Sequence, residues 1–464
     1  MPIHCMNLPP STSHRLGRLG RLVLPVLAAG VLAAGCHGVP AAGEKAARRE
    51  VAVAGEALHT NLPGLSTNAT LADCVRFAVR NQPRVAVAYA DWAASVEDIT
   101  VARSRPDPKL TFEFYVGDAL TSLMPGVMQD FPGAGKLAAR GAAATAESRV
   151  KYFQFAGAVQ QAALAVGQSY YPLHYLDARL EVNRQTLGLL AGLETLARAQ
   201  NEVGRGTLQD VLRAQIEAEE LRTDTVDLED SRRVLLAQFK AALGLRADRP
   251  DPPVPAEAAF VETKLSDDEW LALALKQNPR LQEMAAEIQV ADAALRVADR
   301  EKAPDFSAGG EVDVKASPVV WNPQLSMTLP VWRDKLAAEL AAARAARRGA
   351  QARLTAEQID VAVDFTEQAY LIREADRKLT LVRERLLPRA RESLTVARAA
   401  YQSGQLDFLN VIEAERALLD FQLEEIAGQT QHELARQELT VLIAGVRPEP
   451  ALVATEEKTA STAN

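Results

Sequence analysis

Hydrophobic and polar residues alternate along four short runs of the chain. In 110–116 the apolar residues hold the even positions, and similar alternation marks 306–315 and 319–329, with a weaker form at 120–131. A period of two with one apolar face is typical of β-strands. Each run has about ten residues, the length that a tilted strand needs to cross a bilayer. A soluble, half-buried sheet shows the same alternation, so both interpretations stay open at this point.

Long stretches rich in alanine, leucine, arginine and glutamate follow each pair of predicted strands. These residues favour helices, and Gly204 and Gly404 stand where the stretches end, as glycine does at helix C-termini. A helix of about 65 residues reaches roughly 100 Å, so these are rods. We expect Pro172 and Pro388 to kink or interrupt them. The predicted helices are two opening helices at 71–102 and 267–302, two rods at 136–203 and 335–401, and two return helices at 208–243 and 406–444.

The two halves of the chain carry the same landmarks in the same order. Gly204 and Val211 in the first half are answered by Gly404 and Val411 in the second. Several ordered matches of this kind indicate an internal duplication, and the prolines between the halves predict an extended linker. We therefore divide the chain into a signal peptide (1–35), an acylated N-terminal segment (36–66), a first repeat (67–245), a linker (246–262), a second repeat (263–445) and a disordered tail (446–464).

Four strands are too few to close a membrane barrel, because the smallest outer-membrane barrels have about eight and lipid does not tolerate an open sheet edge. Copies of the chain must then share one sheet. Two copies would enclose a filled lumen, and three copies, with about twelve strands, a channel. Charged residues on the polar face of the strands (Glu113, Glu311, Asp313 and Lys315) favour a wet lumen and therefore three copies. The predicted fold is mainly α, with duplicated long-helix hairpins that form a trimeric α-barrel above a small shared β-barrel.

The N-terminus has the pattern of a targeting segment. Arginines precede the apolar run 22–35, which is long enough for a signal peptide and too short to span a bilayer. Small residues lead directly into Cys36, as at a bacterial lipoprotein cleavage site, so we expect Cys36 to be lipidated. Cleavage after Ala34 or Gly35 by ordinary signal peptidase is the alternative. One acyl chain binds membranes weakly and would only assist another anchor.

Composition excludes several classes of function. The 464-residue chain has a net charge of −8, whereas a nucleic-acid binder needs a basic face. Its cysteines (Cys5, Cys36 and Cys74) are too few for a disulfide framework or a structural zinc site, and its histidines are scattered. We expect no metal and no cofactor, and we expect Cys74 to be a small core residue.

The sequence gives little support for an enzyme. The run from Gly133 to Lys136 suggests a phosphate-binding loop, but Asp130 and Leu137 replace the glycine and the hydroxyl residue that such a loop requires. We interpret this run as a flexible corner between a strand and a helix. The chain shows no pair of carboxylates set apart from the general charge of its helices, and we predict that it is not an enzyme.

Over 71–445 the chain resembles the TolC family of outer-membrane efflux channels. The resemblance rests on the duplicated halves, on the Asn and Pro signals near Pro83 and Pro279, and on the segment from Leu387-Pro388 through Gly404 to Ala414. It implies a homotrimer in the outer membrane of a Gram-negative bacterium, with a helical tunnel across the periplasm. It also implies docking to a periplasmic adaptor (a membrane fusion protein) and to an inner-membrane pump, which we expect to be of the resistance-nodulation-division type.

The resemblance also assigns roles to residues at the helix turns. It makes the two turns the tips that the adaptor contacts: Val203, Gly204 and Arg205, and Ser403, Gly404 and Gln405. It places the periplasmic gate at Asp210, Tyr401, Asn410 and Glu413. Leu406 stands where the family has an arginine partner, and Asn410 stands where it has an acidic residue. Three copies of Glu413 would make a negative constriction that attracts cations.

The predicted function is that of a passive exit duct for heavy-metal cations or drugs in a tripartite efflux pump. Two alternatives remain from the residues. The first is an outer-membrane conduit for type I protein secretion, because the pump rather than the channel selects the cargo. The second is a periplasmic coiled-coil structural or adaptor lipoprotein, which would have no lipid-facing band.

Overall fold

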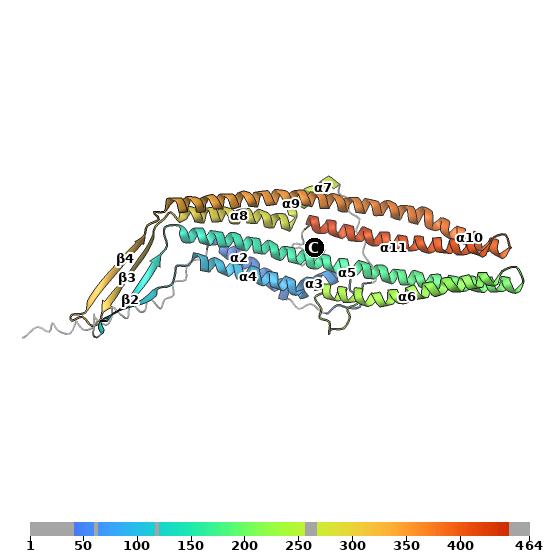
Figure 1. The fold of residues 1–464 in the computed structure, drawn as a ribbon, viewed down its shortest axis with the longest axis horizontal. Coiled ribbons are helices and arrows are strands. Elements are labelled where there is room, and N and C mark those ends of the chain that lie inside the picture. Colours follow the sequence, from blue (N-terminus) through green and yellow to red (C-terminus); the bar gives the residue numbers. More distant parts are fainter. Residues whose placement is uncertain (1–40, 60–63, 117–119, 256–266, 445–464) are drawn as a thin grey trace, which may run out of the picture.

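The computed structural model describes residues 41–59, 64–116, 120–255 and 267–444. The chain forms one elongated body, with a sheet at one end and two helix turns at the other (Figure 1). The predicted signal peptide, Cys36 and the predicted tail lie outside the described residues, as does part of the predicted linker.

Helices make up most of the body, and the two halves share one element order, except that the first half has an additional helix at its start and a π-helical turn divides the long helix of the second half. The elements are α2 (Ala42–His59), α3 (Leu71–Asn81), α4 (Pro83–Arg103), β1 (Lys109–Val116), β2 (Leu120–Phe131), α5 (Lys136–Glu202), α6 (Leu208–Ala242), α7 (Asp267–Gln277), α8 (Pro279–Arg300), β3 (Asp305–Asp313), β4 (Val320–Thr328), α9 (Arg333–Leu381), a π-helical turn (Val382–Leu386), α10 (Leu387–Gln402) and α11 (Phe408–Ala444). Helix α2 was not predicted.

Each opening helix is broken once, where the sequence predicted a continuous helix. Gln82 separates α3 from α4, and its ψ of 117° is extended, because the residue before a proline avoids the helical conformation. Asn278 breaks the second opening helix in the same way before Pro279. Its side-chain oxygen accepts a hydrogen bond from the backbone N–H of Arg280 at 2.8 Å and so caps α8.

The two prolines within the predicted rods behave differently. Helix α5 continues through Pro172, so the prediction that this proline interrupts the helix was wrong. Its neighbours Tyr170 and Leu173 are fully buried, and α5 contacts α4, α6, α8 and α11, so packing on several sides offsets the missing hydrogen bond. At Pro388 the predicted interruption is confirmed, because a π-helical turn ends α9 just before it.

The four strands form one antiparallel sheet in the order β1-β2-β3-β4. The register places apolar residues opposite one another on one face: Leu110 opposite Val127, Phe306 opposite Met327, and Val312 opposite Trp321. This face is open in the single chain, and Leu325 is 79% exposed. Within the described residues, β1 and β4 are each paired on one side only, so both sheet edges are free.

The opposite face of the sheet is polar. The Ser122 hydroxyl donates to Asp313 at 2.8 Å, and the Ser307 hydroxyl donates to Asp130 at 2.6 Å. Glu311 lies on this same face and is buried. The predicted division of the strands into an apolar and a polar face is therefore confirmed.

The corner between β2 and α5 is tightly held, in contrast to the predicted flexible corner. Lys136 is buried, and its amino group lies 2.9 Å from Glu301 and 3.0 Å from Asp305. The backbone N–H of Gly133 donates to Asp305 at 2.7 Å. Although burial works against it, hydrogen bonding to the two carboxylates raises the pKa of Lys136. The lysine joins the two halves of the chain and is not free to bind a phosphate.

Hydrophobic packing is divided into separate clusters along the body. One cluster joins α2, α4 and α5 around Trp92 and Phe155, whose rings stack at 5.6 Å. Another lies around Tyr170 and includes Cys74, which is fully buried as predicted. Burial raises the pKa of the Cys74 thiol to about 11. A third cluster joins α5, α6, α10 and α11 next to the helix turns.

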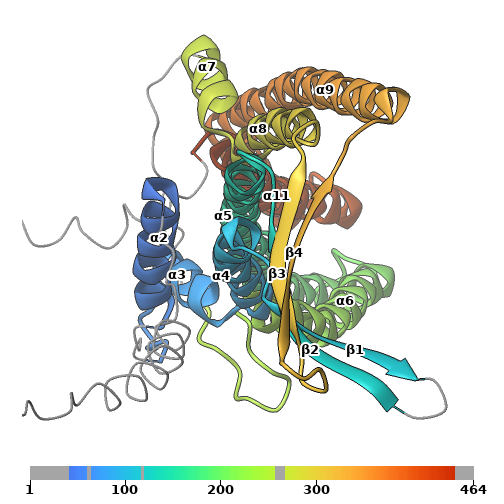
Figure 2. The ribbon, with the colours of Figure 1, turned by 90° about the vertical axis from the view of Figure 1, so that its left-hand side faces the viewer.

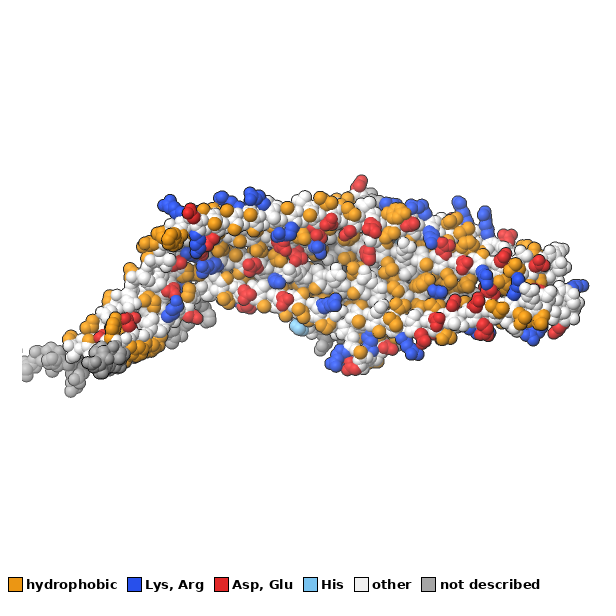
Figure 3. Space-filling view, in the orientation of Figure 1, with side chains coloured by type: hydrophobic (Ala, Val, Ile, Leu, Met, Phe, Trp, Pro, Cys, Tyr) orange, Lys and Arg blue, Asp and Glu red, His pale blue; other side chains and the backbone are white. Residues whose placement is uncertain are grey.

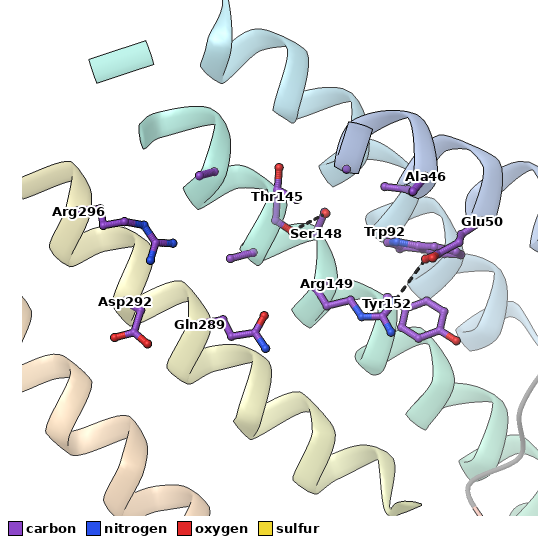
Figure 4. Close-up of a pocket in the computed structure, with 14 residues that line it drawn as sticks. Ala46, Glu50, Trp92, Thr145, Ser148, Arg149, Tyr152, Gln289, Asp292 and Arg296 are labelled. Atoms are coloured by element: carbon purple, nitrogen blue, oxygen red, sulfur yellow. Dashed lines mark hydrogen bonds and ion pairs between the residues drawn. The ribbon is translucent and has the colours of Figure 1, made fainter. Parts of the chain in front are cut away.

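A cavity of about 430 Å³ lies beside α2, between α5 and α8 (Figure 4). Arg149 faces it, pairs with Glu50 of α2 at 3.2 Å and packs over the Tyr152 ring at 4.4 Å. Asp292 pairs with Arg347 at 2.5 Å. The Arg149–Glu50 pair fixes α2 against α5, and the Asp292–Arg347 pair joins α8 to α9. No described helix combines the length and the hydropathy that a membrane crossing requires.

Candidate functional site

The two helix turns at the end of the body opposite the sheet have the same construction (Figure 1). Gly204 and Gly404 have φ values of +72° and +75°, a conformation that glycine adopts without strain. In each turn the next residue donates its backbone N–H back to the helix at 2.8 Å, from Arg205 to Gln200 and from Gln405 to Ala400. The residues assigned as tips are exposed: Val203, Gly204, Arg205, Ser403, Gly404 and Gln405.

Asp210 and Tyr401 are in contact. The Tyr401 hydroxyl donates to a carboxylate oxygen of Asp210 at 3.2 Å, although the two residues belong to different helix hairpins. The Tyr401 side chain is buried and packs against the Phe408 ring at 5.1 Å. Burial, followed by the charge of Asp210, raises the pKa of Tyr401 to about 12. The hydroxyl therefore stays protonated throughout the physiological pH range and can donate its hydrogen bond to Asp210.

Asp210 has a second role, which the sequence analysis missed. It forms a capping box with Thr207: its carboxylate accepts from the Thr207 backbone N–H at 3.0 Å, and its own N–H donates to the Thr207 hydroxyl at 3.2 Å. A threonine followed three residues later by an acidic residue is the usual signal for this cap. The cap starts α6 and fixes the carboxylate that Tyr401 contacts.

A second contact joins the two hairpins and was also missed. Arg416 of α11 binds Glu217 of α6, with its Nε 3.0 Å from a carboxylate oxygen. Hydrogen bonding to Glu217 raises the pKa of Arg416. The counterpart of Glu217 in the second repeat is Ala417, so the pair breaks the repeat pattern. Only the packing of α6 beside α11 identifies it.

Asn410 and Glu413 lie apart from the Asp210–Tyr401 contact. Both are exposed and line a groove of about 690 Å³ between α10 and α11, together with Leu406. Arg389 and Glu392 line the same groove, so it carries charges of both signs. Within one chain the predicted gate residues thus form two sets, one that joins the hairpins and one that faces outward.

Exposed apolar side chains run along helices on the outside of the body (Figure 3). On α6 they include Leu208, Leu212 and Ile216, spaced by one helical turn. On α9, Ile359 and Val363 line a groove of about 1030 Å³. The end-on view shows α6 and α9 on different sides of α5 (Figure 2). Two separate apolar stripes of this kind are typical of surfaces that another chain covers.

Comparisons with known proteins support one family. Residues 270–445 match the family model described as outer membrane efflux protein. The outer membrane protein VceC from Vibrio cholerae has a similar structure, with a TM-score of 0.67 and 17% identity, over 81% of this chain and 97% of that chain. CusC is also similar, with a TM-score of 0.70 and 16% identity, over 84% of this chain and 96% of that chain. At such identities the similarity establishes the fold.

The open state of the MtrE outer membrane channel from Neisseria gonorrhoeae is also similar, with a TM-score of 0.67 and 16% identity, over 82% of this chain and 90% of that chain. The comparison with curated proteins found no match.

We predict that Tyr401→Phe loosens the contact between the hairpins without unfolding the chain. The substitution removes one hydrogen bond to a charged acceptor, worth about 1.5 kcal/mol. Amide hydrogen exchange near 208–214 and 398–402 should become roughly tenfold faster. Tyr175→Phe is the matched control, because Tyr175 lies away from the turns. Unchanged exchange in Tyr401→Phe would contradict this role for the hydroxyl.

Proposed function

We propose that this chain, whose residues 270–445 match the outer membrane efflux protein family, forms the outer-membrane channel of a tripartite efflux pump. Three copies would share one barrel in the outer membrane and one helical tunnel across the periplasm. The channel would be a passive duct for heavy-metal cations or drugs. A periplasmic adaptor and an inner-membrane pump, of the resistance-nodulation-division type, would supply the substrate and the energy.

The observation that carries this proposal is the sheet. Among the described residues, one face of the sheet is apolar and exposed, the other is polar, and neither edge strand has a partner on its outer side. Free backbone groups at a sheet edge cost several kcal/mol each in lipid. A single chain therefore cannot place this sheet in a bilayer, whereas joining β4 of one copy to β1 of the next removes every edge. Three copies would give about twelve strands with the polar face toward a water-filled lumen.

The apolar stripes on the helices support the same assembly. Leu212 and Ile216 of α6 and Ile359 and Val363 of α9 are about half exposed or more in the single chain. In a closed ring of copies, each chain presents one stripe to each neighbour. A periplasmic coiled-coil protein would account for the helix stripes but would leave the apolar face of the sheet in water.

The contacts near the turns support a gate at the periplasmic end. Tyr401 with Asp210 holds the second hairpin against the first inside each chain. Glu413 of three copies would face one another and attract cations, with Asn410 beside it in the same groove. The six turn residues from Val203 to Arg205 and from Ser403 to Gln405 would contact the adaptor.

The placement of the sheet in the outer membrane is tested by substitutions at two adjacent residues. Leu325→Arg puts a charge on the apolar face of the sheet, at a cost of about 2–4 kcal/mol near the bilayer midplane, whereas Gln324→Arg puts the same charge on the polar face. In a deletion strain tested with metals and drugs side by side, the wild type and Gln324→Arg should restore tolerance. Leu325→Arg should not, and should be lost from the outer-membrane fraction. Equal behaviour of the two variants would exclude a lipid-facing sheet.

Wild-type complementation that restores no tolerance to any metal or drug would contradict the efflux function. If a secreted protein disappeared from the medium of the deletion strain instead, the conduit would serve protein secretion.

The gate is tested by conductance in planar bilayers. We expect low conductance for the wild type and higher conductance for Tyr401→Phe and for Asp210→Ala, because both variants lose the contact between the hairpins. Asp210→Ala should show the larger increase, since it also removes the cap of α6. Wild-type conductance in both variants would place the gate elsewhere.

Lipidation of Cys36 is tested by metabolic labelling. Radioactive palmitate should label the wild type and should not label Cys36→Ala. The variant should still reach the outer membrane, because one acyl chain contributes little to anchoring. Equal labelling of both proteins, or of neither, would show that Cys36 is not acylated.

A further inference from the structure

Glu415 of α11 is a buried carboxyl group at the contact between the two hairpins. The residue is 3% exposed, and its α11 neighbours Ala414 and Leu418 belong to the cluster that α5, α6, α10 and α11 form next to the turns. In the part of the chain that the structure describes, no donor hydrogen bonds to this carboxyl group and no cation pairs with it at ion-pair distance. A carboxylate with so little exposure and no donor loses most of its hydration, which disfavours its ionised form.

The first repeat shows how the same position is normally occupied. Since Val211 and Ala214 correspond to Val411 and Ala414, Gln215 corresponds to Glu415. The Gln215 amide donates to Glu194 at 2.8 Å within its hairpin. In the second repeat Leu394 replaces Glu194, so the partner is apolar. The position therefore accepts a neutral polar side chain, which for glutamate means the protonated acid.

The charges that act on Glu415 also favour its neutral form. Burial comes first, followed by the charge of Glu217 on α6, and together they raise the pKa of Glu415 to about 7. Asp420 on α11 acts in the same direction, and Arg416 opposes it. The charged groups that act on Glu415 belong to α6 and α11, whereas α5 and α10 contribute apolar side chains such as Leu193 and Leu394 to the neighbouring cluster.

Arg416 connects this carboxyl group to the contact between the hairpins. Its guanidinium already binds Glu217 across the hairpins. When Glu415 ionises, Glu217 and Glu415 compete for the guanidinium of Arg416. The two carboxylates also repel each other. Ionisation therefore weakens the Arg416–Glu217 contact at the same end of the body as the Tyr401–Asp210 contact.

We propose that a proton on Glu415 holds the two hairpins of each chain together, and that its loss loosens them, so that periplasmic pH sets how readily the channel opens. This inference rests on the proposed channel function.

The direction of the pH response follows from which arrangement of the hairpins, closed or open, binds the proton on Glu415 more tightly. The closed arrangement raises the pKa above the value of 4.5 that a solvated glutamate has, so its extra stability is complete below that value and is lost as the pH rises through about 7. If opening exposes Glu415 to water, the ratio of open to closed hairpins should rise about tenfold per chain between pH 6 and pH 8.

The test is conductance of the full-length protein in planar bilayers at pH 6, 7 and 8. We expect the wild type to open more often as the pH rises, and Glu415→Gln to stay at the low level of pH 6 throughout. Glu229→Gln removes an exposed carboxylate from α6 and should keep the wild-type response. A pH response in Glu415→Gln equal to that of the wild type would overturn the proposal.

A second measurement does not depend on pore formation. The infrared band of a protonated carboxyl group should titrate near pH 7 in the wild-type protein and should be absent in Glu415→Gln. Absence of such a titration in the wild type would also overturn the proposal. Failure to form any pore would contradict the proposed channel function. The two failures can be told apart, because the infrared titration of Glu415 does not depend on pore formation.

Discussion

Unpaired backbone at the two edges of a small sheet is the constraint on which the rest of this structure depends. The strands alternate apolar and polar residues, and the resulting sheet has an exposed apolar face that water disfavours. Lipid suits that face but not the free N–H and C=O groups of β1 and β4. In the proposed channel, copies of the chain complete each other's sheet and so meet both demands. In the proposed assembly the long helices, the apolar stripes and the turns are parts of one shared wall.

The helices divide their stability among local clusters, because a rod of this length has no central core. Trp92, Tyr170 and Tyr401 each lie in a different cluster along the body. Lys136 connects the two halves where helices meet strands, through Glu301 and Asp305. At the far end the two hairpins are joined by the hydrophobic cluster that includes Tyr401, and by polar contacts that include Tyr401 with Asp210 and Arg416 with Glu217. Each polar contact of this kind is worth about 1–3 kcal/mol, so the loss of one weakens the turn end without touching the clusters nearer the sheet.

The sequence predicted the elements well because their patterns are local. Strand alternation placed β2 at its observed bounds, and Gly204 and Gly404 marked the turns. The break at Gln82 was missed, although the rule for a residue before proline would have given it. Continuity through Pro172 could not be predicted, since it depends on the helices packed around α5. The Asp210–Tyr401 contact was expected only from the family resemblance, and neither Glu217–Arg416 nor the burial of Glu415 has a local signal.

The central claim is that one chain cannot seal its own membrane-crossing wall. It is tested most directly by the protein mass of the purified detergent-solubilised particle, determined by multi-angle light scattering with the detergent contribution subtracted. The account predicts a single species with three times the mass of one processed chain. A uniform single-chain particle, stable without detergent, would contradict it.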